Sequence, residues 1–69
     1  MTYDKLIKKL KRSPYIFYGS WVAVDKNGTV FLFLGKPRII DTCWEGDCCR
    51  VIPNIIKLPK WKDSLVQVR

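Results

Sequence analysis

The sequence predicts an α+β fold, in which one N-terminal helix packs on a small antiparallel sheet of four or five strands. Three observations lead to this prediction. A helical pattern opens the chain, a strong hairpin signal follows it, and short runs of β-branched and aromatic residues come after the hairpin. The 69 residues predict a single domain over 1–69. The core of such a small domain is marginal unless a metal, disulfides or oligomerisation supports it.

The first element is a helix predicted over residues 2–13. Its apolar stripe consists of the residues Tyr3, Leu6, Ile7 and Leu10, which recur at helical spacing. Thr2 is placed to cap the first turn with its side-chain oxygen, and Asp4 lies near the positive end of the helix dipole. Pro14 disfavours helical backbone at Ser13, so the helix should end there.

A β-hairpin is the clearest structural signal in the chain. Its two strands are predicted near Trp21–Asp25 and Thr29–Leu34, which are rich in β-branched and aromatic residues. The intervening "DKNG" contains Asn27 and Gly28, two residues that tolerate positive φ and therefore favour a tight turn.

The rest of the chain predicts shorter extended segments. Residues 38–40 ("RII") follow a break at "GKP" and form a short segment of this kind. A second turn is predicted at 45–47 ("EGD"), followed by a strand over 48–52 that ends at the "PN" of 53–54. The final strand is predicted over 64–68 ("SLVQV").

Alternation gives the hairpin two apolar faces. Trp21 and Ala23 point to one side of the sheet, whereas Val22 and Val24 point to the other. The helix can cover one face, so the second needs another cover. A second subunit is the first expectation, and it predicts a homo-oligomer. The alternative is a strongly curled sheet that wraps its own second face.

The charge balance points to an anionic partner. Thirteen Lys and Arg residues against six Asp and Glu give a net charge of +7, which favours association with nucleotides, nucleic acid or an acidic protein. No apolar run approaches the ~20 residues that span a bilayer, so no membrane partner is expected. The N-terminal residues also lack the uninterrupted apolar core of a signal peptide, which predicts a cytosolic protein.

The residue types present argue against catalysis. The chain contains no histidine, which removes the commonest general base and excludes Ser/His/Asp and Cys/His arrangements. The carboxylates Asp41, Glu45 and Asp47 cluster around a predicted turn, where such residues usually serve turn geometry and solubility. No glycine-rich phosphate loop occurs. The sequence therefore predicts a protein that is not an enzyme and needs no cofactor.

All three cysteines lie in "DTCWEGDCCR", at residues 41–50. Their spacing, Cys-x₄-Cys-Cys with no second pair of Cys or His ligands, does not fit a zinc site, so no metal is expected. A disulfide from Cys43 to Cys48 or Cys49 is geometrically conceivable, but it would not persist in a reducing cytosol. We therefore expect reduced cysteines that fill space in the core.

Cations with aromatic neighbours form the candidate ligand-binding set. Its members are Lys36, Arg38, Trp44, Arg50, Lys60 and Trp61. An indole can stack on a nucleobase while a nearby cation pairs with its phosphate. The alternative for each tryptophan is a place in the hydrophobic core, which is the more common use of a tryptophan in a small domain.

The motifs "WVAVDKNGTV", "GKPR" and "WKDSL" give the chain a resemblance to known proteins. It resembles the small accessory proteins of bacteriophages and prophages, over most of the chain from Trp21 to Leu65. Those proteins often share a short N-terminal helix, a "W-x-A-x-D-x-x-G-x-V" hairpin and a C-terminal "W-x-D-S-L" segment. The resemblance implies a viral protein that works in the host cytoplasm by stoichiometric binding, often against host defence.

Three functions follow from charge and resemblance together. The first is an oligomeric binder that sequesters a phosphate-rich defence nucleotide in pockets between subunits. There Lys36, Arg38 and Arg50 would pair with phosphates, and Trp44 or Trp61 would stack on a base. The second is a basic nucleic-acid-binding module, and the third is an inhibitor that docks on an acidic face of a host protein.

Overall fold

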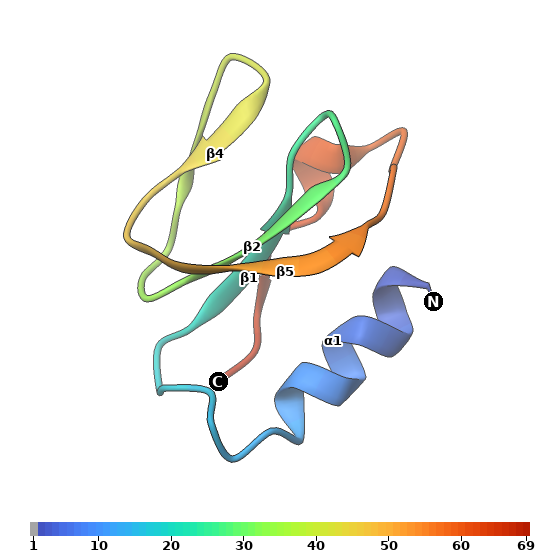
Figure 1. Cartoon of the computed structure of the whole chain (residues 1–69). Helices are drawn as coiled ribbons and strands as arrows, with labels where there is room; N and C mark the ends of the chain where they lie inside the picture. The colour runs from blue at the N-terminus through green and yellow to red at the C-terminus, as the bar shows by residue number, and fades with distance from the viewer. Residues whose placement is uncertain (1) are drawn as a thin grey trace.

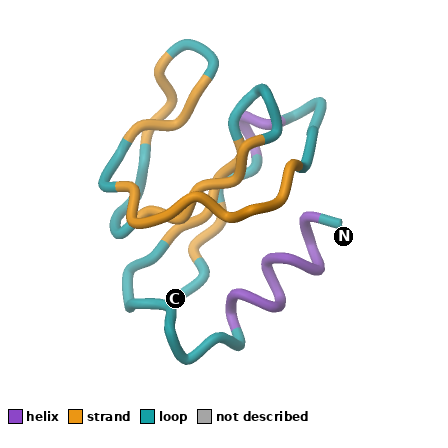
Figure 2. Tube along the Cα trace, in the orientation of Figure 1, coloured by secondary structure: helices purple, strands orange, loops and turns teal. Residues whose placement is uncertain are grey.

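The computed structural model describes residues 2–69, without the side chain of Cys49, and it confirms the α+β fold (Figure 1). Within these residues, one α-helix packs on a four-stranded antiparallel sheet, which a separate two-stranded hairpin accompanies. The elements in chain order are α1 (Tyr3–Lys11), β1 (Trp21–Val24), β2 (Thr29–Phe33), β3 (Arg38–Ile40), β4 (Cys43–Glu45), β5 (Cys48–Ile55), the 3₁₀ helix η1 (Trp61–Asp63) and β6 (Val66–Gln67). Figure 2 shows how loops connect these short elements.

Helix α1 forms as its cap and apolar pattern predict. Thr2 has extended backbone, and its side-chain oxygen accepts a hydrogen bond from the Lys5 amide (3.3 Å), which satisfies one free donor of the first turn. Leu6 and Ile7 are buried against the sheet. The helix therefore owes its place to one apolar face and leaves its lysines in solvent.

Tyr3 fastens the start of the helix to the sheet. Its hydroxyl donates to the Ser64 carbonyl (2.6 Å) and to the Val22 carbonyl (3.3 Å). Burial raises the pKa of the Tyr3 phenol well above its ordinary value, and the side-chain hydroxyl of Ser64 lowers this pKa in part. The phenol therefore remains a protonated donor at neutral pH.

The β1–β2 hairpin confirms the prediction within one residue at each strand end. Trp21 pairs with Phe33 and Val24 pairs with Val30. Gly28 has a φ of +90° and donates its amide to the Asp25 carbonyl (2.9 Å). Gly28 alone supplies the positive φ of this turn, because a glycine adopts it without steric cost.

The four-stranded sheet has the order β5-β2-β1-β6, and α1 covers one of its faces. The residues buried between helix and sheet are Leu6, Ile7, Ile16, Val22, Val24, Val30, Leu32, Ile52 and Val68. This cluster is the larger of two cores. β1, β2 and β5 supply buried members, and Val66 of β6 packs against the cluster.

The second face of the sheet is covered by the chain itself. Trp44 from β4 and Trp61 from η1 pack on Ala23 and Phe33 to form the second core. The cover over β1 thus comes from the separate β3–β4 hairpin and from η1, and not from a strongly curled sheet that wraps its own second face. The reason for expecting a partner subunit there is removed, although Val51 of the edge strand β5 remains half exposed. The homo-oligomer stays a prediction.

Two strand predictions need correction. β4 pairs with β3, whereas β5 pairs with β2, so residues 45–47 connect two sheets and do not form the turn of one hairpin. β5 also continues through Pro53 and Asn54 to Ile55. Proline is tolerated because β5 lies at the sheet edge, where a missing amide donor costs no ladder bond.

The end of the chain also differs from the prediction. The last strand covers Val66–Gln67 and not the whole of 64–68, and η1 precedes it. Ser64 ends η1, with its hydroxyl donating to the Trp61 carbonyl (2.6 Å). The strand is short because this segment first has to place Trp61 under the sheet.

The cysteine prediction is wrong for two of its three residues. Cys43 and Cys48 are exposed and free, so they do not fill core space. Cys43 lies beside the β3–β4 turn, where its thiol donates to the Ile40 carbonyl (3.4 Å). The packing predicted for Cys49 concerns a side chain outside the described structure. In the described part of the chain, no three His, Cys, Asp or Glu residues are grouped to hold a metal ion.

Candidate functional site

The four cations of the predicted set lie on different segments of the fold, although Lys36 and Arg38 are only two residues apart in the chain. Lys36 follows β2, Arg38 begins β3, Arg50 lies on β5, and Lys60 precedes η1. All four are exposed. Arg38 forms an ion pair with Glu45 across the β3–β4 hairpin at 3.9 Å, and because both side chains are largely exposed, solvent screens the pair. The structure thus does not gather these cations into one pocket.

The two tryptophans of the predicted set are buried. Trp44 is 9% exposed and Trp61 is 8% exposed, both in the second core. The Trp44 amide donates to a carboxylate oxygen of Asp25 (2.9 Å), and its indole N–H donates to the Val24 carbonyl (2.9 Å). Neither indole is free to stack on a base, so the core alternative for each tryptophan is the correct one.

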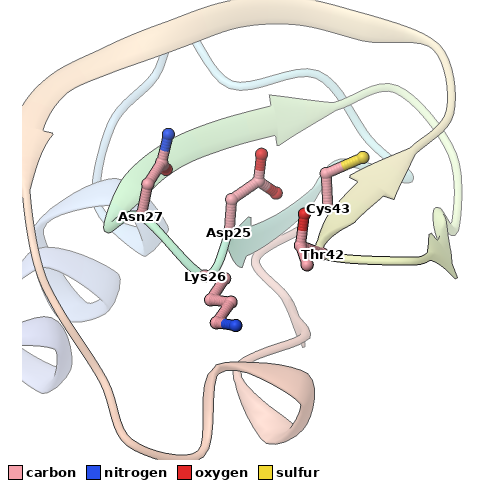
Figure 3. A pocket seen from close by; sticks show the side chains of 5 residues that line it. All are labelled: Asp25, Lys26, Asn27, Thr42 and Cys43. Carbon is pink, nitrogen blue, oxygen red and sulfur yellow. The ribbon is translucent and has the colours of Figure 1, made fainter.

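Asp25 is a residue whose importance the sequence did not reveal. Its carboxylate holds the Trp44 amide, and the neighbouring Lys26 amide donates to the Thr42 carbonyl (3.2 Å). These bonds join the tips of the β1–β2 and β3–β4 hairpins. A hollow of about 400 Å³ lies at this junction (Figure 3). Its lining residues are Asp25, Lys26, Asn27, Thr42 and Cys43.

A second hollow, of about 460 Å³, lies beside the start of α1. It is lined by Tyr3, Asp4, Leu58, Pro59, Lys60, Asp63, Ser64 and Val66. Lys60 contributes one cation there, but Asp4 and Asp63 contribute two carboxylates. A phosphate-rich ligand would meet repulsion in this hollow, and in the first one a single lysine stands beside an acid. Neither hollow suits a ligand of that kind.

An exposed group of aromatic side chains lies in the loop between α1 and β1. Tyr15 is 83% exposed, Phe17 is 69% exposed and Tyr18 is 87% exposed. We call these three residues the aromatic loop. None of the three belongs to the candidate ligand-binding set that the sequence predicts. Their density between Pro14 and Gly19, two residues that interrupt a strand, is the signal that could have found them.

Two cations lie over aromatic rings near the aromatic loop. The Arg69 guanidinium carbon lies 5.5 Å from the centroid of the Tyr18 ring, and the Lys36 ammonium lies 5.6 Å from a Trp21 ring centroid. Trp21 pairs with Phe33 of β2 and with Gln67 of β6, so the segments that carry these contacts meet at one end of the sheet. We call Trp21, Lys36 and Arg69, together with the aromatic loop, the basic–aromatic surface. Trp21 packs on the side of the second core, whereas Ile16 anchors the loop in the first core, so this surface includes residues from both sides of the sheet.

Comparisons with protein-family models, with curated proteins and with solved structures give no match. Residues 2–69 also contain no helix that is both long enough and apolar enough to cross a membrane.

Proposed function

We propose that this protein is a non-enzymatic binder of phosphate-rich nucleotides, which acts by stoichiometric association. The observation that supports this proposal best is the positive charge of the solvent-exposed Lys and Arg side chains. Every Lys and Arg is exposed except Arg69, which is half-buried. Among the described residues, one ion pair is present, the solvent-exposed contact of Arg38 with Glu45. The net charge of +7 is thus available to an anionic ligand.

The distribution of this charge supports nucleic acid as the ligand. The exposed face of α1 carries Lys5, Lys8, Lys9, Lys11 and Arg12. Lys36 and Arg50 add positive charge at two other places, on the loop after β2 and on β5. A polyanion long enough to reach several of these places gains from each, whereas a compact nucleotide needs them in one pocket. The geometry therefore reverses the order in which the sequence ranks these two ligands.

A compact defence nucleotide remains the second candidate because the resemblance to phage accessory proteins implies it. Its pocket would have to form between subunits of the expected homo-oligomer, since the two hollows of the single chain carry carboxylates. In either form the ligand would be bound in the host cytoplasm and released unchanged.

Salt-dependent binding tests the proposal. The purified protein is titrated into a labelled single-stranded oligonucleotide of about 12 nucleotides at several salt concentrations, followed by fluorescence anisotropy. The logarithm of the binding constant should fall linearly with the logarithm of the salt concentration. The expected slope is about −0.7 for each neutralised phosphate. Lys8→Gln on the exposed face of α1 should reduce the slope without reducing thermal stability.

A thermal-shift panel of oligonucleotides, cyclic nucleotides and mononucleotides runs beside the titration. A ligand that binds the folded state must raise the melting temperature. No shift with any nucleotide, and no anisotropy change, would overturn the proposal. Recovery of one acidic protein and no nucleotide from host lysate would do the same, and would favour the inhibitor function.

A further inference from the structure

We infer that the basic–aromatic surface is a binding site for unpaired bases of single-stranded nucleic acid. This inference rests on the proposed function and adds to it the place of binding and the form of the ligand. The aromatic rings would stack on bases, and Lys36 and Arg69 would pair with the backbone phosphates beside them.

The exposure of the aromatic loop is its first unexplained property. Four consecutive residues run from Tyr15 to Tyr18, and only Ile16 among them is buried, at 5% exposure. Ile16 anchors the loop in the first core, while its three aromatic neighbours contribute nothing to that core. Large aromatic side chains left in water are a feature of binding surfaces, because their burial awaits a partner.

The loop is held in place by the end of the chain. The Gly19 amide donates to the Arg69 carbonyl (2.9 Å), and the Arg69 guanidinium donates to the Ser13 carbonyl. The Ser20 hydroxyl closes the loop on the Phe17 carbonyl (2.6 Å), and Gly19 permits the turn with a φ of +81°. The rings are therefore presented by an ordered backbone, which lowers the entropy lost when a ligand binds.

The charge around these rings favours a polyanion. Three segments build the basic–aromatic surface, and no Asp or Glu occurs in residues 5–24, 29–40 or 64–69. The last turn of α1, which leads into the loop, adds the exposed Lys11 and Arg12. These segments thus offer cations and carry no Asp or Glu of their own. Glu45 and Asp47 lie beside the segment that carries Lys36, because Glu45 pairs with Arg38 and the Asp47 carbonyl accepts the Leu34 amide (2.8 Å). An apolar protein partner would leave these cations without a counter-charge.

The chemistry of stacking selects unpaired bases. A base in a duplex already has both of its faces covered by neighbouring bases, whereas a base in a single strand can lie flat on a tyrosine or phenylalanine ring. Tyr15, Phe17 and Tyr18 lie on an open loop and line neither hollow. Exposed rings of this kind can each stack on a base, whatever the sequence of the strand.

The test compares a mixed-sequence single strand of about 12 nucleotides with the same strand annealed to its complement. The wild-type protein should bind the single strand more tightly. Tyr18→Ala should weaken single-strand binding about 5- to 100-fold and leave the salt slope unchanged, because it removes a stacking platform and no phosphate contact. Tyr18→Phe should restore most of the affinity. Lys36→Ala should make the salt slope shallower by about 0.7.

Lys57→Ala is the matched control for loss of one exposed lysine outside the basic–aromatic surface. Circular dichroism should show that all four variants fold, since each changes an exposed side chain. If Tyr18→Ala binds the strand as wild type does, or if the duplex binds as tightly as the strand, the inference is wrong while the proposed function stands. If neither strand nor duplex binds and vesicles rich in anionic lipid bind through Tyr18 instead, both fail.

Discussion

The aromatic loop exposes its aromatic side chains to solvent, whereas the second core buries its aromatic side chains under the sheet. Tyr18 of the loop lies almost fully in water, whereas Trp44 and Trp61 are nine-tenths buried under the sheet. Tyr18 and Trp61 each have a cation over the ring: Arg69 lies over Tyr18, and Lys62 lies over Trp61 at 5.7 Å. A cation beside an aromatic ring therefore does not distinguish a binding site from a core position.

Hydrogen bonding distinguishes the two regions better. Trp44 has both its amide and its indole N–H bonded inside the protein, to Asp25 and Val24. Such a side chain is part of the folding core, because its polar groups are satisfied only when it is buried there. The aromatic loop has its backbone fixed and its rings outside. This difference predicts that the two regions respond oppositely to substitution.

The largest expected effect is that of Trp44→Ala on stability. Truncation of a buried tryptophan costs about 3–5 kcal/mol. The free energy of unfolding of a 69-residue domain is itself about 3–10 kcal/mol. Trp44→Ala should therefore leave the protein partly or wholly unfolded in urea titrations, whereas Tyr18→Ala should change stability by less than about 0.5 kcal/mol. Equal losses from the two substitutions would break the comparison between core and loop.

The next largest stability loss is expected from substitution of Asp25, the hydrogen-bond acceptor of Trp44. Asp25→Ala removes the acceptor of the buried Trp44 amide, and an unsatisfied buried donor costs about 1–3 kcal/mol. Asp25→Asn keeps an acceptor oxygen in the same place, so it should lose less stability than Asp25→Ala. Asp47→Ala, at an exposed carboxylate, serves as the control and should be nearly neutral in the same urea titration. A loss from Asp47→Ala as large as that from Asp25→Ala would contradict the assigned role of Asp25.

The smallest stability loss is expected for Tyr3, which is less exposed than Tyr18 and less buried than Trp44. Tyr3→Phe removes its hydrogen bonds to Ser64 and Val22 and should cost about 0.5–1.5 kcal/mol at neutral pH.

The contribution of Tyr3 to the free energy of unfolding should decrease at high pH. Because burial raises the pKa of Tyr3 in the folded protein, its contribution is complete below about pH 10, the pKa of an unfolded tyrosine. The contribution falls as pH rises above that value towards the folded pKa. Unfolding at pH 8 to 11 should show a decline that is smaller in Tyr3→Phe. An unchanged decline would mean that Tyr3 is not responsible.

Much of the fold was predictable because its signals are local. Thr2 and Pro14 bound the helix, and Gly28 supplies the φ that the hairpin turn requires. The strand pairing of β4 and β5 was not predictable in this way. Two strands only two residues apart would ordinarily form a hairpin, but β5 pairs with β2 and β4 with β3, so the choice depends on contacts between distant segments.

The candidate site was predictable only in part. Lys36 is exposed with its ammonium over Trp21, and its contact with a ligand stays a prediction. Arg38, Arg50 and Lys60 are also exposed, and they belong to β3, to β5 and to the segment before η1. The aromatic loop was missed because a run of aromatic residues is typical of a strand, and only the position of Ile16 in the core turns its neighbours outward.

By itself, the sequence determined the helix, the first hairpin and the two apolar faces of the sheet, because capping, turn chemistry and alternation act over a few residues. It also determined the strong positive charge, because net charge depends only on composition. The tertiary structure decided which aromatic side chains are buried. Trp44 lies under the sheet because Asp25, 19 residues away, accepts its amide hydrogen. Tyr18 lies in water on a loop whose Ile16 is buried in the first core and whose Gly19 amide is bonded to the Arg69 carbonyl. Burial of this kind depends on contacts that no local pattern records.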